Sequence, residues 1–149
     1  MILIIGYGNT LRRDDGGGVA LAKKLHQIWH EQQLHVQIII VHQLVPELAQ
    51  DIAHEDISTV VFVDTRIIDS CLDNHGIEIQ PISLQDSSPA SNHYMTATTL
   101  MTYAHFLYNA HAVALQVTVP GHDFGYGEIF SDITQQALDN LPDSVYTLF

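Results

Sequence analysis

The first fifteen residues of the chain, Met1-Ile-Leu-Ile-Ile-Gly-Tyr-Gly-Asn-Thr-Leu-Arg-Arg-Asp-Asp15, constrain the fold more than any other stretch. The uninterrupted apolar run from Ile2 to Ile5 is typical of a strand buried on both faces, as in a parallel sheet. Two glycines then allow a sharp turn, and two adjacent acids follow at Asp14 and Asp15. In open α/β sheets the loop after the first strand is a usual place for a site. We therefore expect the functional centre in this loop.

Similar apolar runs along the chain predict further strands, and apolar residues at helical spacing predict helices between them. The predicted strands are Ile2–Ile5, Val36–Val41, Thr59–Val63, Ile77–Ile82 and Ala112–Val119. The predicted helices are Val19–Trp29, Pro46–Ile52, His93–Tyr108 and Asp132–Leu141. Pro81 assigns its strand to a sheet edge. The alternation predicts one α/β domain over residues 1–149, in three layers, with a five-stranded, mostly parallel, twisted sheet flanked by helices.

The composition limits which partners the protein can bind and which cellular compartment it suits. Five basic against seventeen acidic residues give a formal charge of -12, which repels nucleic acid and anionic membranes. Polar residues interrupt every apolar stretch before it reaches the length of a membrane helix, and no signal peptide is recognisable. The single cysteine, Cys71, cannot form an internal disulfide. We expect a cytoplasmic protein without nucleic-acid or membrane partners.

Three side chains are candidates for one site at an edge of the sheet. Asp15 follows the first predicted strand, Asp64 ends the third, and His93 begins the helix after the fourth. The first and third strands are neighbours in many doubly wound sheets, so the two acids could converge. Two carboxylates and an imidazole suit a borderline divalent metal such as zinc or nickel. Acids at strand ends also serve as caps, and histidines are often structural, so spacing by itself leaves both interpretations open.

Three other known motifs share features with this loop. A dinucleotide fingerprint needs a third glycine where Leu11 stands, and a phosphate loop needs a Gly-Lys-Ser/Thr sequence that the chain lacks. A phosphoacceptor receiver domain would account for the paired acids and for Asp64. It also uses a lysine near the end of its fifth strand, whereas the lysines here are Lys23 and Lys24, on an early helix. The receiver interpretation therefore lacks its charge-neutralising partner.

The segment Gly6-Tyr-Gly-Asn-Thr-Leu-Arg-Arg-Asp-Asp-Gly16 resembles the opening signature of the hydrogenase maturation proteases, endopeptidases that trim the large subunits of nickel–iron hydrogenases. The resemblance continues through Val-Phe-Val-Asp64 and through His93-Tyr-Met95, so it spans nearly the whole chain. It implies a twisted sheet between helices, with Asp15, Asp64 and His93 lining a metal-contacting site. Relatives carry Glu or Asp at the first of these positions, so Asp15 fits the pattern.

The resemblance also implies the reaction. Nickel is carried by the large-subunit precursor, the protease senses it, and a short C-terminal extension is then removed; other divalent metals are expected to substitute in the site. Peptide hydrolysis needs a polarised carbonyl and an activated water, and Asp15 or its neighbour Asp14 is the candidate general base. A non-enzymatic nickel-binding chaperone for the same precursor is the alternative from another class.

Two further features concern specificity and the loop itself. His42, Gln43 and Leu44 occupy a segment that varies among family members, and the version here resembles proteases of the bidirectional, NAD-linked hydrogenases of cyanobacteria. An ordinary strand-to-helix loop capped at Pro46 accounts for the same residues. Gly17 stands where relatives commonly have an apolar residue, and the triple glycine is expected to loosen the loop, at a cost of about 1 kcal/mol of helix propensity per residue.

Overall fold

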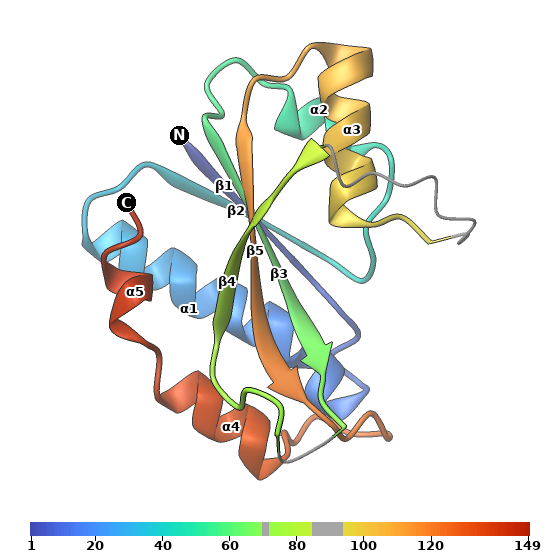
Figure 1. Ribbon diagram of the computed structural model, residues 1–149, viewed down its shortest axis with the longest axis vertical. Coiled ribbons are helices and arrows are strands. Elements are labelled where there is room, and N and C mark those ends of the chain that lie inside the picture. The colour runs from blue at the N-terminus through green and yellow to red at the C-terminus, as the bar shows by residue number, and fades with distance from the viewer. Residues whose placement is uncertain (70–71, 85–93) are drawn as a thin grey trace.

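The computed structural model describes residues 1–69, 72–84 and 94–149, and in this part of the chain five strands form a sheet between two layers of helices (Figure 1). The strands are β1 (Ile2–Tyr7), β2 (Val36–Val41), β3 (Thr59–Ile67), β4 (Glu78–Ile82) and β5 (Val113–Gly121), in the order β2-β1-β3-β5-β4. All neighbouring pairs are parallel except β4 with β5. The predicted α/β class, the mostly parallel sheet and the edge position of the Pro81 strand are confirmed.

Helices cover both faces of the sheet. A single 3-10 turn, η1 (Arg13–Gly16), leads into α1 (Gly17–Glu31), which packs on one face with α4 (Asp132–Asp139) and α5 (Asp143–Tyr146); α2 (Leu48–Ile52) and α3 (Ala97–Tyr108) cover the other (Figure 1). Successive side chains of β1 enter opposite cores, Leu3 and Ile5 on the α2–α3 side and Ile2 and Ile4 on the α1 side. This explains why the strand is apolar at every position. None of the described helices is long and apolar enough to span a bilayer.

Two strands extend further than the sequence predicts. The apolar runs stop at Val63 and Val119, but β3 and β5 continue their parallel pairing to Ile67 and Gly121. Asp64 therefore lies within β3, one residue after Val63, which is the last residue of β3 to pair with β1. The prediction that Asp64 ends its strand is wrong, because pairing with β5 alone carries the polar segment onward.

Pro120 was expected to close the fifth strand but lies inside β5, opposite Arg66 of β3. Proline has no N–H to donate, so it is tolerated where one side of a strand needs no donor. The β4 ladder ends at the pair Glu78–Thr118. In the described ladders, Pro120 is thus paired on its β3 side alone.

Helix α3 begins later than predicted. It starts at Ala97, and the extended residue Thr96 is its N-cap, accepting a hydrogen bond from the Thr99 N–H at 3.1 Å. Tyr94 and Met95 precede the helix, so the predicted start at His93 is wrong. His93 itself lies outside the described residues, as does Cys71.

The triple glycine lets α1 pack directly against the sheet. A Cβ on Gly17 would lie 2.9 Å from Val119 Cγ1, and one on Gly18 would lie 2.7 Å from the Cα of Asp64. The Gly18 N–H donates to the Thr65 hydroxyl at 3.0 Å, and that hydroxyl donates to the Asp14 carbonyl at 2.7 Å. The expectation that these glycines loosen the loop is wrong, since they allow a close and hydrogen-bonded contact.

Gly18→Ala is expected to lower the free energy of unfolding by about 2 kcal/mol, because overpacking against backbone outweighs a gain of about 1 kcal/mol in helix propensity. Besides the Asp64 Cα, the added methyl would meet the Tyr7 carbonyl oxygen at 2.9 Å, and no side-chain rotation relieves either contact. Urea denaturation measures the change. Gly76→Ala is the control, since its Cβ would meet nothing closer than an Asn74 side-chain atom at 3.4 Å. Equal stability of the Gly18 variant would show that the close contact is dispensable.

Candidate active site

Asp15 and Asp64 lie near each other at the carboxyl end of β1. Asp15 belongs to η1, and Asp64 follows the last β3 residue paired with β1. Both residues are half-buried. The negative charge of Asp15 acts on the Asp64 carboxyl and contributes to raising its pKa. Two of the three predicted site residues are therefore brought together, and their proposed roles stay predictions.

The glycines of the first loop fix the position of Asp15. Gly8 has φ +142°, a conformation that L side chains rarely adopt, and a Cβ there would lie 2.1 Å from the Asp15 carbonyl oxygen. The Asn9 N–H donates to Asp15 Oδ2 at 2.7 Å. The Gly8 N–H donates to the Val41 carbonyl at 3.3 Å, which ties the same loop to the end of β2. The Gly-Tyr-Gly-Asn sequence thus positions one carboxylate against the backbone.

The Asp64 carboxyl has an unusual environment for an aspartate. Burial raises its pKa to about 6, with a further contribution from Asp15, while hydrogen bonds from the Thr65 N–H (2.7 Å to Oδ1) and from Tyr7 act in the opposite direction. The Tyr7 hydroxyl also accepts a hydrogen bond from the Gln116 side-chain amide at 3.2 Å. Burial, and then the Asp64 charge, raise the pKa of Tyr7, so it remains a neutral donor. The Asp64 carboxyl therefore ionises near pH 6, closer to neutral pH than an ordinary aspartate does.

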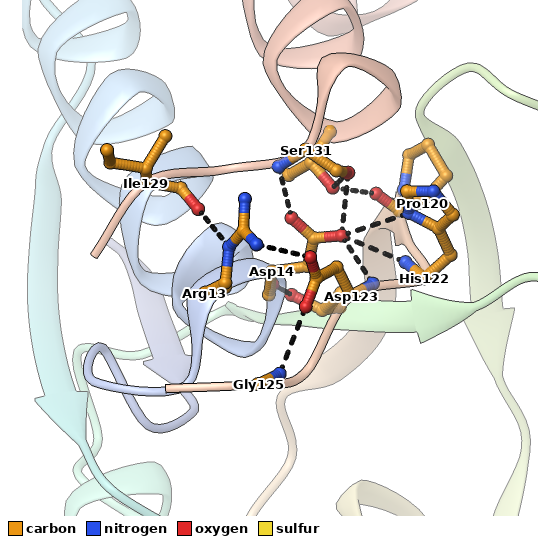
Figure 2. Close-up of polar contacts among 10 residues, drawn as sticks. Arg13, Asp14, Pro120, His122, Asp123, Gly125, Ile129 and Ser131 are labelled. Carbon is orange, nitrogen blue, oxygen red and sulfur yellow. Dashed lines mark hydrogen bonds and ion pairs between the residues drawn. The ribbon is translucent and has the colours of Figure 1, made fainter. Parts of the chain in front are cut away.

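Asp14 is a different kind of acid from its neighbour, because it is completely buried. Figure 2 shows its carboxylate among the donors of Ser131, His122 and Asp123. Its Oδ1 accepts the Ser131 N–H at 2.7 Å, and its Oδ2 accepts the Ser131 hydroxyl at 2.7 Å and the His122 and Asp123 N–H groups at 2.9 Å. Burial by itself raises the pKa of Asp14, but the donors from Asp123, Ser131 and His122 outweigh it and hold the pKa well below its usual range. A carboxylate so held is a poor proton acceptor, which argues against Asp14 as general base.

The second glycine-rich loop, residues 122–131, is fastened to the first by Asp14 and by the two arginines before it. Arg12 and Gly127 form a short parallel bridge, and Arg13 pairs with Asp123 and donates through Nε to the Ile129 carbonyl at 2.9 Å (Figure 2). The sequence analysis assigned no role to this loop and overlooked Ser131. Asp14, which Ser131 contacts, lies more than a hundred residues away along the chain, a separation that no local pattern reveals.

The predicted specificity segment follows β2, beside the Gly8 loop. His42 and Gln43 are exposed, whereas Leu44 is 6% exposed and packs in the core beneath α2 and α3. The first two can therefore contact a partner directly, and the side chain of Leu44 contributes to the fold.

The metal-binding prediction needs His93, which lies outside the described residues. Within residues 1–69, 72–84 and 94–149, no group of three His, Cys, Asp or Glu side chains is placed to hold an ion. The two carboxylates supply oxygen donors of the kind that first-row and harder divalent metals accept. The chemistry of Asp15 and Asp64 fits such an ion, and a nitrogen donor would have to come from elsewhere.

The fold corresponds to that of a known class of enzymes, the hydrogenase maturation proteases. NiFe hydrogenase maturation protease HycI from Thermococcus kodakarensis KOD1 superposes with a TM-score of 0.68 at 20% identity, covering 93% of this chain and 85% of that one. HybD from the same organism gives 0.62 at 16% identity over 99% and 95% of the two chains. The hydrogenase maturating endopeptidase HybD from E. coli gives 0.61 at 15% identity over 99% and 88%. No family model matches the sequence, and no curated protein does. At these identities the likeness is one of fold.

Proposed function

We propose that the protein is an endopeptidase that removes the C-terminal extension of a nickel-loaded hydrogenase large-subunit precursor. The observation that carries the proposal is the pair of half-buried, electrostatically coupled carboxylates, Asp15 and Asp64, at the carboxyl end of β1 in the fold of the maturation proteases. On fold and signature, we also assign it to the cytoplasm and to the bidirectional, NAD-linked type of hydrogenase, with His42 and Gln43 contacting the precursor.

The chemistry of the pair suits this reaction. Nickel arrives as part of the substrate, and Asp15, Asp64 and His93 are the proposed contacts to it, leaving positions for water or for the scissile carbonyl. Of Asp14 and Asp15, the two acids that the sequence suggested as general base, Asp15 remains the candidate. Asp64 is a second candidate, because a pKa of about 6 leaves it ionised at neutral pH yet a better proton acceptor than an ordinary aspartate.

Mass spectrometry of nickel-loaded precursor incubated with the protein tests the proposal. The wild-type protein is expected to shorten the precursor at its C-terminus. Asp15→Asn keeps the shape of the side chain and removes its charge, so cleavage should fall by about 100-fold or more while the melting temperature does not fall. Asp139→Asn is the matched control, because this exposed acid lies on α4, on the α1 face of the sheet.

The metal dependence is tested with the same assay. Chelator-treated protein should cut nickel-loaded precursor normally, and nickel-free precursor should stay intact, because cysteine thiolates in the precursor hold nickel more firmly than two carboxylates and a histidine would. A chelated protein that is inactive until zinc is restored would place the metal in the enzyme instead.

Binding of the precursor without any loss of mass would favour the chaperone alternative.

The receiver-like alternative has lost support, since receiver-type sheets have the parallel order 2-1-3-4-5. Here β5 lies beside β3, and the edge strand β4 is antiparallel.

A further inference from the structure

Helix α3 presents an apolar face to solvent. Its twelve residues include no Asp, Glu, Lys or Arg. One side packs into the core, and the other exposes Tyr103 (39%), Phe106 (75%), Leu107 (68%) and Tyr108 (44%). Residues three and four apart share one side of a helix, so Tyr103, Phe106 and Leu107 form a continuous surface. Contiguous exposed apolar surface of this kind marks interaction sites.

A groove lies between this face and α2, which packs beside α3 on the same side of the sheet (Figure 1). It has a volume of about 240 Å³, and its lining includes Pro46, Ala49, Tyr103 and Leu107. The Gln50 side-chain amide donates to the Tyr108 hydroxyl at 3.3 Å and joins the two helices. We call this feature the α2–α3 groove.

The groove has an acidic border. Glu47 lines it, and Asp51 lies one turn further along the same helix. Residues 42–58 hold four acids, and neither this range nor residues 94–112 contains a lysine or arginine, so the two ranges carry a formal charge of -4. A second copy of the chain would bring like charges together across this surface. Charge complementarity therefore points to a positively charged occupant.

The specificity segment connects the loop of the candidate active site to the groove along the chain. The loop that carries Asp15 is hydrogen-bonded to Val41, at the end of β2, through Gly8. From there the chain passes through His42 and Gln43 to Pro46, which lines the groove. A partner that extends from the groove along this segment would reach the loop that carries Asp15.

We propose that the α2–α3 groove docks an apolar, positively charged surface segment of the hydrogenase large-subunit precursor, an inference that rests on the proposed function. Contact here would hold the precursor by a surface separate from its C-terminal extension. The extension would then reach Asp15 and Asp64 as part of an already bound molecule, at a high effective concentration.

Two substitutions in the full-length protein test the apolar and the electrostatic parts of the contact. Leu107→Gln removes apolar contact surface without adding charge and should raise the Kd for nickel-loaded precursor about tenfold. Glu47→Lys should raise the Kd as well and weaken its dependence on salt. Tyr146→Gln and Asp139→Lys are the matched controls on the opposite face of the sheet and should stay within about twofold of wild type. Biolayer interferometry gives the Kd, and the cleavage assay at saturating precursor should show an unchanged kcat for Leu107→Gln.

The outcomes separate this inference from the proposed function. If wild type cuts the precursor and both groove variants bind it as tightly as wild type, the docking inference is overturned and the protease function stands. If wild type binds without cutting and the variants lose binding, the groove is a docking surface and the protease function falls. A wild-type protein that neither binds nor cuts the precursor overturns both. A wild-type dimer that Leu107→Gln converts to monomer identifies a second copy as the occupant and also overturns the inference.

Discussion

Asp14→Asn is expected to lower the free energy of unfolding by about 3 kcal/mol at pH 7.5, equivalent to a fall of about 10 °C in the melting temperature. The wild-type carboxylate is completely buried and accepts four hydrogen bonds of 2.7–2.9 Å from His122, Asp123 and Ser131. An asparagine keeps one acceptor oxygen and turns its NH2 group towards at least one of these backbone N–H groups, which cannot accept a hydrogen bond. Hydrogen bonds to a charged group contribute about 1.5–3 kcal/mol each, so losing even part of the set is costly.

The pH dependence follows from the lowered pKa of Asp14. Because the folded state holds this carboxylate ionised below its ordinary pKa of 3.8, the stabilisation is complete above about pH 4 and is lost as the pH falls further. The difference in stability between wild type and Asp14→Asn should therefore narrow as the pH drops below 4. Thermal melts by circular dichroism across pH 3 to 8 measure it.

Ser131→Ala provides a milder test of the same network. It removes the hydroxyl that donates to Asp14 at 2.7 Å and keeps the backbone donor, so a loss of about 1 kcal/mol is expected. The exposed Asp139, 3.9 Å from Lys24, is the control acid, and Asp139→Asn should change stability by less than about 0.5 kcal/mol. A fully stable Asp14→Asn protein that has lost cleavage would instead return Asp14 to the list of catalytic acids.

The contrast between Asp14 and Asp15 marks a limit of sequence reasoning about the site. The two residues are identical and adjacent, and both follow the same strand, so local pattern cannot assign one to the fold and the other to chemistry. The distinction depends on Ser131 and on residues 122–123, which the sheet brings back to the first loop. The convergence of Asp15 and Asp64 was predictable, because parallel neighbouring strands end at the same edge.

The fold was predictable where burial sets the pattern. Strands buried on both faces, such as β1, give continuous apolar runs, and Pro81 indicated the edge strand. Predicted strand ends failed at Asp64 and Pro120 because polar residues and a proline can continue a ladder when one neighbouring strand supplies the pairing. The start of α3 was misplaced, although Thr96, a favoured N-cap residue, was a signal for it.

The glycine run shows how propensity can mislead. Propensity scales penalise glycine for its flexibility, which predicted a loose segment at residues 16–18. The scales take no account of the space around a residue, and here the absence of a Cβ allows α1 to contact Val119 and the Asp64 backbone. The need for glycine arises from β3 and β5, and it becomes visible once the strands are assembled.

Asp64→Asn is expected to stabilise the metal-free protein while abolishing cleavage, the opposite of the effect expected at Asp14. Burial and the charge of Asp15 raise the pKa of Asp64 from 3.8 to about 6, so ionisation of this group opposes folding. Between about pH 4 and pH 6 the folded state keeps a proton that the unfolded state has already lost, and stability therefore falls as the pH rises through this window. Above it the deficit is constant, at about 3 kcal/mol. Asparagine carries no such charge and can still accept the hydrogen bond from the Thr65 N–H.

The stability gain of Asp64→Asn should thus be present at pH 7.5, shrink through pH 6 to 4, and vanish below pH 4, as measured by urea denaturation in the presence of a chelator. Asp15→Asn should raise stability less, because it removes the smaller contribution to the Asp64 pKa and leaves burial unchanged. Combining the two variants should give less than the sum of their separate gains, since the repulsion between the carboxylates can be removed only once. A stable but inactive Asp64→Asn protein would mean that the fold tolerates an unfavourable charge which the reaction needs. A variant that is less stable than wild type at pH 7.5 would show that the ionised Asp64 contributes to the fold, and its place in the candidate site would lose its main physical support.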